Sequence, residues 1–157
     1  MLGLTIALAM IMSYIEALVP LSFAVPGIKM GLANIVIIFV LYKIGTKEAI
    51  LVSLIRVILV SLLFSNVMAM AYSIAGAVLS LSVMWLLKKT DRFSFVGVSI
   101  AGGIMHNVGQ IITAVILLGT EQIALYLPVL IITGTVTGVV IGIVSGLVIN
   151  RFKTIRL

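Results

Sequence analysis

Long runs of apolar residues, separated by short polar stretches, follow one another along almost the whole chain. A helix that crosses the roughly 30 Å hydrocarbon core of a bilayer needs about 20 consecutive, mainly apolar residues. The runs therefore predict an all-α membrane protein, a bundle of six transmembrane helices that forms one domain over residues 1–157. The predicted helices cover residues 2–19, 30–44, 47–64, 67–87, 95–118 and 129–149.

Composition agrees with a lipid environment. Hydrophobic residues make up 63% of the chain and charged residues 9%, whereas soluble domains are about 25% charged. The net charge of +6 does not indicate a nucleic-acid partner, because the basic residues lie in short loops between apolar runs rather than on one face among aromatic residues. The chain has no cysteine, which excludes disulfides and thiolate chemistry.

Basic residues are distributed unevenly between the two sides of the predicted bundle. Cytoplasmic loops of membrane proteins carry an excess of Lys and Arg. With six spans, one side has only Lys29 and the interior has only Arg56. We therefore expect a multi-pass protein of the cytoplasmic membrane with both termini in the cytoplasm. The cytoplasmic side would hold the remaining basic residues, Lys43, Lys47, Lys88, Lys89, Arg92, Arg151, Lys153 and Arg156.

Several polar side chains lie at membrane depth in the predicted bundle. Ionisable groups there are costly and usually face the bundle interior or a cavity. At 1.5 Å per helical residue, Arg56 and His106 lie near the midplane and Glu16 lies near the outer end of the first helix. The sequence thus predicts a polar substrate site in the outer half of the bundle. Its candidate residues are Glu16, Lys29, Asn34, Arg56, Tyr72, His106, Asn107 and Gln110.

Two interpretations of this polar set remain open. In a structural interpretation, Arg56 and Glu16 form a buried ion pair and His106 is hydrogen-bonded within the core. In a functional interpretation, the surplus positive charge binds an anionic group through Lys29 and Arg56. The other side chains would then supply hydrogen bonds or stacking. No metal site is expected, because one histidine with scattered carboxylates does not form one.

Small residues recur every four positions in two of the predicted helices. Such stripes allow two helices in a membrane to approach very closely. They could pack inside the bundle or against a partner membrane protein, and the spacing alone does not decide between the two. The stripes consist of Ala9, Ser13 and Ala17 in the first helix and of Gly134, Gly138, Gly142 and Gly146 in the last.

The sequence has no motif that would make the chain an enzyme. A prenyl transferase needs an aspartate-rich motif to hold Mg²⁺, and Asp91 is the only aspartate. No Walker motif is present either. We therefore expect no catalytic residues and no cofactor.

Six segments of the chain form a recognisable series. They are 15–20 (IEALVP), 25–34 (VPGIKMGLAN), 54–57 (LIRV), 72–76 (YSIAG), 101–110 (AGGIMHNVGQ) and 125–129 (LYLPV), the last followed by the glycine-rich helix. In content and order they resemble the Gx transporter family, which is also described as heptaprenyl diphosphate synthase component I. The resemblance covers nearly the whole chain.

The resemblance implies a likeness to the S-components of energy-coupling factor transporters. These are small six-helix proteins that bind a substrate at an outward-facing site. They work with an energy-coupling transmembrane subunit and two ATPases, and they pack small residues of the first helix against that partner. The function implied is uptake of a small molecule that is anionic or related to isoprenoids and quinones.

Two other functions remain open. The synthase description implies a non-catalytic membrane subunit associated with heptaprenyl diphosphate synthesis. A self-contained small transporter is a third possibility.

Overall fold

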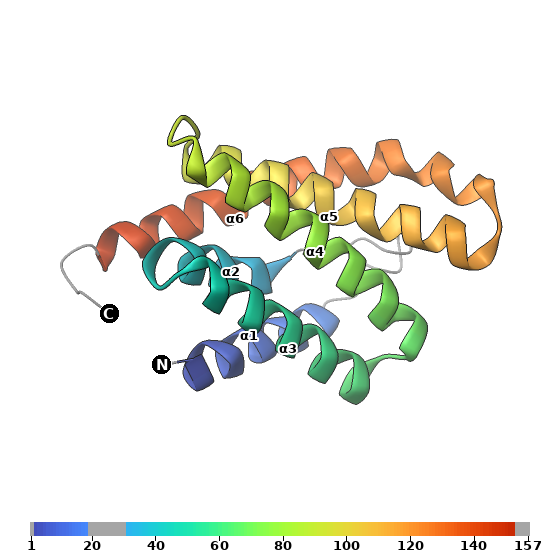
Figure 1. Cartoon of the computed structure of the whole chain (residues 1–157), viewed down its shortest axis with the longest axis horizontal. Helices are drawn as coiled ribbons and strands as arrows, with labels where there is room; N and C mark the ends of the chain where they lie inside the picture. Colours follow the sequence, from blue (N-terminus) through green and yellow to red (C-terminus); the bar gives the residue numbers. More distant parts are fainter. Residues whose placement is uncertain (1, 19–30, 153–157) are drawn as a thin grey trace.

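The structure, a computed structural model, describes residues 2–18 and 31–152 (Figure 1). Helices make up most of both ranges, and short turns connect them. Neither range contains a strand, so the predicted all-helical class is confirmed. The helices are α1 (Leu2–Leu18), α2 (Leu32–Lys43), α3 (Thr46–Phe64), α4 (Val67–Lys89), α5 (Phe95–Leu118), the 3₁₀ helix η2 (Glu121–Tyr126) and α6 (Leu127–Arg151).

Local sequence explains several helix ends. The Asn66 side chain accepts a hydrogen bond from the Ala69 amide, and the Ser94 side chain accepts one from the Gly97 amide. Both side chains satisfy amides that have no partner within the first turn of a helix. At the other end of α5, Gly119 adopts the left-handed conformation (φ 62°) in which helices commonly terminate.

Every helix except α5 differs from its predicted range by one or two residues at an end, and the starts of α2 and α6 have a clear local cause. Helix α2 has only 12 residues, about 18 Å at 1.5 Å per residue, and begins after Gly31, which is left-handed (φ 71°). Helix α6 begins at Leu127, two residues before the predicted start. Pro128 fits within its first turn, where the missing amide hydrogen costs nothing.

The helices form two layers (Figure 1). In one layer, α5 packs along both α4 and α6. In the other layer, α1, α2 and α3 pack against one another. Contacts of α2 with α6 and of α3 with α4 join the layers. The most buried helix is α2, whose Ile37, Ile38 and Leu41 are almost completely inaccessible.

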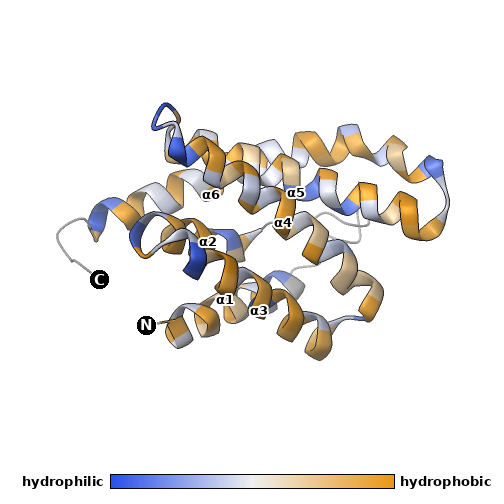
Figure 2. Ribbon diagram, in the orientation of Figure 1, coloured by the Kyte–Doolittle hydropathy of each residue, from blue (hydrophilic) through white to orange (hydrophobic). Residues whose placement is uncertain are grey.

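Hydrophobic residues predominate along the helices (Figure 2), and many of them are exposed. Leu4, Leu62, Ile116 and Leu147 are each more than 60% exposed, which a soluble monomer rarely shows over so wide an area. Helices α4 and α5 and the segment Glu121–Arg151 are each long and apolar enough to cross a membrane. These features indicate a multi-pass membrane protein.

The basic turns gather at one end of the molecule. The Lys43 ammonium donates to the carbonyl of Phe152 (2.6 Å), and the Lys88 ammonium donates to the carbonyl of Leu41. The last turns of α2, α4 and α6 therefore adjoin, at the left of Figure 1, where the turn that contains Arg92 also lies. The six-span topology and the cytoplasmic position of the termini stay predictions.

Candidate functional site

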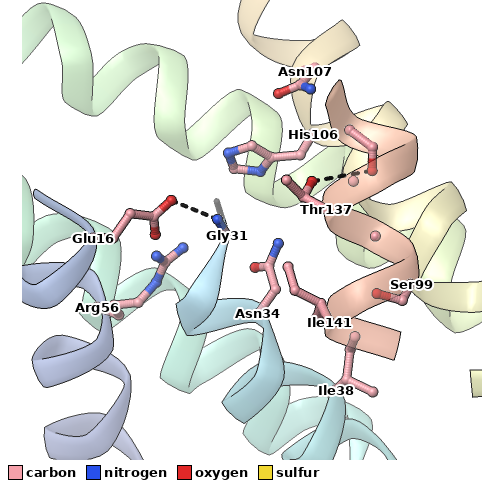
Figure 3. A pocket seen from close by; sticks show the side chains of 13 residues that line it. Glu16, Gly31, Asn34, Ile38, Arg56, Ser99, His106, Asn107, Thr137 and Ile141 are labelled. Atoms are coloured by element: carbon pink, nitrogen blue, oxygen red, sulfur yellow. Dashed lines mark hydrogen bonds between the residues drawn. The ribbon is translucent and has the colours of Figure 1, made fainter. Parts of the chain in front are cut away.

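A small polar cavity lies where α1, α2 and α3 meet α5 and α6 (Figure 3). Its volume of about 40 Å³ is enough for about three water molecules, since one water needs roughly 10–15 Å³. Five of the eight predicted substrate-binding residues line it, from four different helices. They are Glu16 of α1, Asn34 of α2, Arg56 of α3, and His106 and Asn107 of α5.

Arg56 reaches the cavity from the middle of α3. Its Nη1 donates to Ser13 Oγ (3.1 Å), while that hydroxyl donates to the carbonyl of Ala9 (2.9 Å). Its Nε is buried and has no hydrogen-bond partner among residues 2–18 and 31–152. The described residues thus leave part of the hydrogen-bonding capacity of this guanidinium unused.

Glu16 lies in the last turn of α1, and Figure 3 shows its carboxylate facing the Arg56 guanidinium. Its Oε1 accepts a 2.6 Å hydrogen bond from the amide of Gly31, the residue before α2. A carboxylate at this place is stabilised by the partial positive charge of the helix N-terminus. Glu16 therefore bonds to α2 and Arg56 to α1, so neither residue makes its hydrogen bond to the other.

Close contact between α5 and α6 builds the opposite wall. A Cβ atom added to Gly103 would lie 2.8 Å from the carbonyl oxygen of Gly134, so the two helices touch through their backbones. Asn107 Nδ2 donates to the carbonyl of Leu130 (2.7 Å) and fixes this wall. From it the His106 imidazole points toward Glu16 and Gly31 (Figure 3).

The other predicted site residues lie elsewhere. Tyr72 and Gln110 line a second, mainly apolar groove of about 420 Å³ between α4, α5, η2 and α6. Lys29 lies outside the described residues. The sequence analysis therefore assigned all these side chains to one site, whereas the structure divides them between two adjoining spaces.

Some lining residues were absent from the predicted set. Thr137 and Ile141 of α6 and Ile38 of α2 contribute to the polar cavity. Thr137 directly precedes Gly138 of the α6 glycine stripe, and this position in the sequence could have identified it as a lining residue. Ser99 of α5 also lines the cavity. Among the described residues, no three His, Cys, Asp or Glu side chains come together as a metal-binding group.

Both small-residue stripes pack against helices of the same chain. Ala9 and Ser13 are buried, and the Ala17 side chain lies outside the described part. The four glycines of the α6 stripe face α5. A Cβ atom added to any of them would meet a residue of α5: Gly103 for Gly134, Ile100 for Gly138, Val96 for Gly142 and Phe95 for Gly146. The structure thus shows packing inside the bundle, one of the two alternatives that the spacing left open.

Comparison with known proteins places the chain in a family. No curated protein and no solved structure matches it. Residues 5–148 match the family described as heptaprenyl diphosphate synthase component I. This range includes every residue that lines the polar cavity. The chain therefore belongs to the heptaprenyl diphosphate synthase component I family.

Proposed function

We propose that this protein is a membrane-embedded, substrate-binding subunit that takes up a small anionic molecule through the polar cavity. The observation that carries the proposal is the buried Arg56 Nε, which has no hydrogen-bond partner among the described residues. A charged side chain at the centre of a membrane helix costs about 2.5–3.5 kcal/mol on insertion scales. A bound anion would offset this cost and complete the hydrogen bonding of the guanidinium.

The charges around the cavity suit such a ligand. Arg56 presents a planar fork of donors, which matches a carboxylate or phosphate group better than a lysine ammonium does. The α2 N-terminus partly offsets the negative charge of Glu16 through the Gly31 amide. His106 and Asn34 line the same cavity and would add hydrogen bonds to the anion.

We assign the protein six membrane spans, with both termini in the cytoplasm, and a role like that of an energy-coupling factor S-component. The gathering of the basic turns at one end of the bundle (Figure 2) supports this orientation. The small six-helix architecture supports the likeness to an S-component. In this role an energy-coupling transmembrane subunit and its ATPases would power transport.

The family description favours a second function, that of a non-catalytic membrane subunit in heptaprenyl diphosphate synthesis. The two functions require different partners. An S-component would co-purify with an ATPase module, and a synthase subunit would co-purify with a prenyl transferase. Both functions are compatible with an anionic, isoprenoid-related ligand at Arg56.

Melting curves of purified variants in detergent test the proposed anion site. Inorganic phosphate and isopentenyl phosphate serve as probes, because a ligand that binds only the folded state raises the melting temperature. We expect isopentenyl phosphate to stabilise the wild type and Arg56→Gln to abolish this effect. Arg56→Lys should bind poorly, because it lacks the planar fork. Arg151→Gln, at the basic end, should respond like the wild type.

Without probe, Arg56→Gln should melt close to the wild type, because the hydrogen bond of Glu16 goes to the Gly31 amide and not to Arg56. A melting temperature far below that of the wild type would give Arg56 a structural role instead. The absence of any response to isopentenyl phosphate in the wild type would also contradict the proposal.

A further inference from the structure

The groove between α4, α5, η2 and α6 has the size and chemistry of a binding site for an apolar chain. Its volume of about 420 Å³ falls within the roughly 300–1,000 Å³ of typical small-molecule pockets. Ile111, Ala114, Leu118 and Leu130 supply much of its wall. The described residues add a few polar side chains, among them Tyr72 and Gln110.

The groove adjoins the polar cavity across one turn of α5. His106 of the cavity and Gln110 of the groove both contact the same point of α4. A Cβ atom added to Gly76 would lie 3.1 Å from His106 Cε1 and 3.0 Å from Gln110 Cγ. On the α6 side, Asn107 of the cavity donates to the carbonyl of Leu130, a groove residue. The two spaces thus share walls on two sides.

The volumes limit what Arg56 can hold. About 40 Å³ accommodates roughly three water-sized groups, which is enough for an anionic head but not for a larger solute. The rest of a larger solute must leave the cavity, and the adjoining groove offers ten times the volume and mostly apolar contacts. Arg56 thus suits a charged head, and the groove suits an apolar tail.

We infer that the solute is an anionic amphiphile, whose head binds beside Arg56 and whose apolar tail lies in the groove. The inference rests on the proposed function and narrows it to one chemical class, a phosphate or carboxylate carried on a short apolar chain. His106 and Gln110 lie at the junction of head and tail. Gln110, which lies one turn of α5 from His106 and near the same glycine of α4, would contact the start of the tail.

The experiment compares geranyl phosphate, inorganic phosphate and geraniol as probes in melting curves of the detergent-purified protein. In the wild type, geranyl phosphate should give the same stabilisation at a concentration at least tenfold lower than inorganic phosphate. Ala114→Phe fills the groove and should remove this tenfold preference while leaving the phosphate response. Ala7→Phe makes the same change at an exposed position of α1 that lines neither space and should keep the preference.

Ala69→Phe, on the α4 wall of the groove, serves as a second filling variant if Ala114→Phe does not fold, and it should behave as Ala114→Phe is expected to. If the filled groove retains the tenfold preference, the tail does not lie there. If geraniol stabilises the wild type and Arg56→Gln as strongly as geranyl phosphate does, the groove holds lipid-like chains independently of the head. Either result overturns the inference. If Arg56→Gln keeps the full response to both phosphates, the proposed function itself fails.

Discussion

Gly138 lies where α6 crosses α5, and the structure predicts that even one added methyl group there is harmful. A Cβ atom at this position would lie 2.7 Å from Ile100 Cα and 3.1 Å from the Ser99 carbonyl oxygen. Carbon atoms normally approach to about 3.5–4.0 Å, so the first contact is about 0.8 Å too short. Both contacts are to helix backbone, which cannot rotate away as a side chain does.

The expected destabilisation follows from this overlap. Inserting a carbon into a packed interface typically lowers stability by about 1–3 kcal/mol. The higher helix propensity of alanine relative to glycine offsets up to about 1 kcal/mol of this loss. Because both short contacts are to backbone, we expect the upper end of this range, a net cost of about 2 kcal/mol. At roughly 2–4 °C per kcal/mol for a chain of this size, Gly138→Ala should melt about 4–8 °C below the wild type in detergent. Because Gly138 and Ser99 also line the polar cavity, the variant should bind the anion more weakly.

Gly97→Ala is the matched control, made near the start of α5. Its added Cβ would meet its nearest neighbour at 3.6 Å, which is an ordinary van der Waals contact. This variant should melt at or above the wild-type temperature. Equal melting temperatures for Gly138→Ala and the wild type would refute the close crossing of α5 and α6.

Two further predictions concern α2 and the topology. Glu16→Ala should lower the free energy of unfolding by about 1–3 kcal/mol, measured as a fall in melting temperature, because it removes the acceptor of the Gly31 amide. Glu16→Gln keeps an acceptor and should lose less stability, so equal losses in the two variants would argue against this hydrogen bond. In the naturally cysteine-free chain, Glu121→Cys should react with an impermeant thiol reagent in intact cells, whereas Arg92→Cys should react only after permeabilisation. The reverse labelling pattern would reject the proposed orientation.

The sequence predicted the helices well, because apolar runs and capping residues are local signals. It failed where a single residue's conformation decides the boundary. Gly31 is left-handed, and α2 therefore starts two residues after the predicted position. The predicted range of α6 began directly after Pro128, although a proline fits within the first helical turn.

The candidate site was predictable in composition but only partly in arrangement. Polar groups avoid lipid, and this rule alone brought together Arg56, His106 and Asn34, which do line one cavity. The rotation of α4 and α5 about their axes depends on packing at Gly76, which no local pattern reveals. For that reason Gln110 was expected beside Arg56 but lines the neighbouring groove.

The role of the glycine stripe was equally dependent on tertiary structure. A four-residue spacing shows that one face of a helix carries only small residues, but it does not indicate which helix packs against that face. In the structure α5 covers the α6 stripe. The apolar groove was not predicted at all, because residues such as Ile111 and Leu130 look like lipid-facing residues in the sequence.

The central claim, that Arg56 binds an anion at membrane depth, is tested most directly by native mass spectrometry of the protein released from detergent. Wild-type protein purified from its own membrane should carry a bound small molecule of negative charge. Arg151→Gln should retain that molecule, and Arg56→Gln, purified in the same way and equally folded, should lack it. An Arg56→Gln protein that carries the same molecule at the same occupancy would contradict the claim.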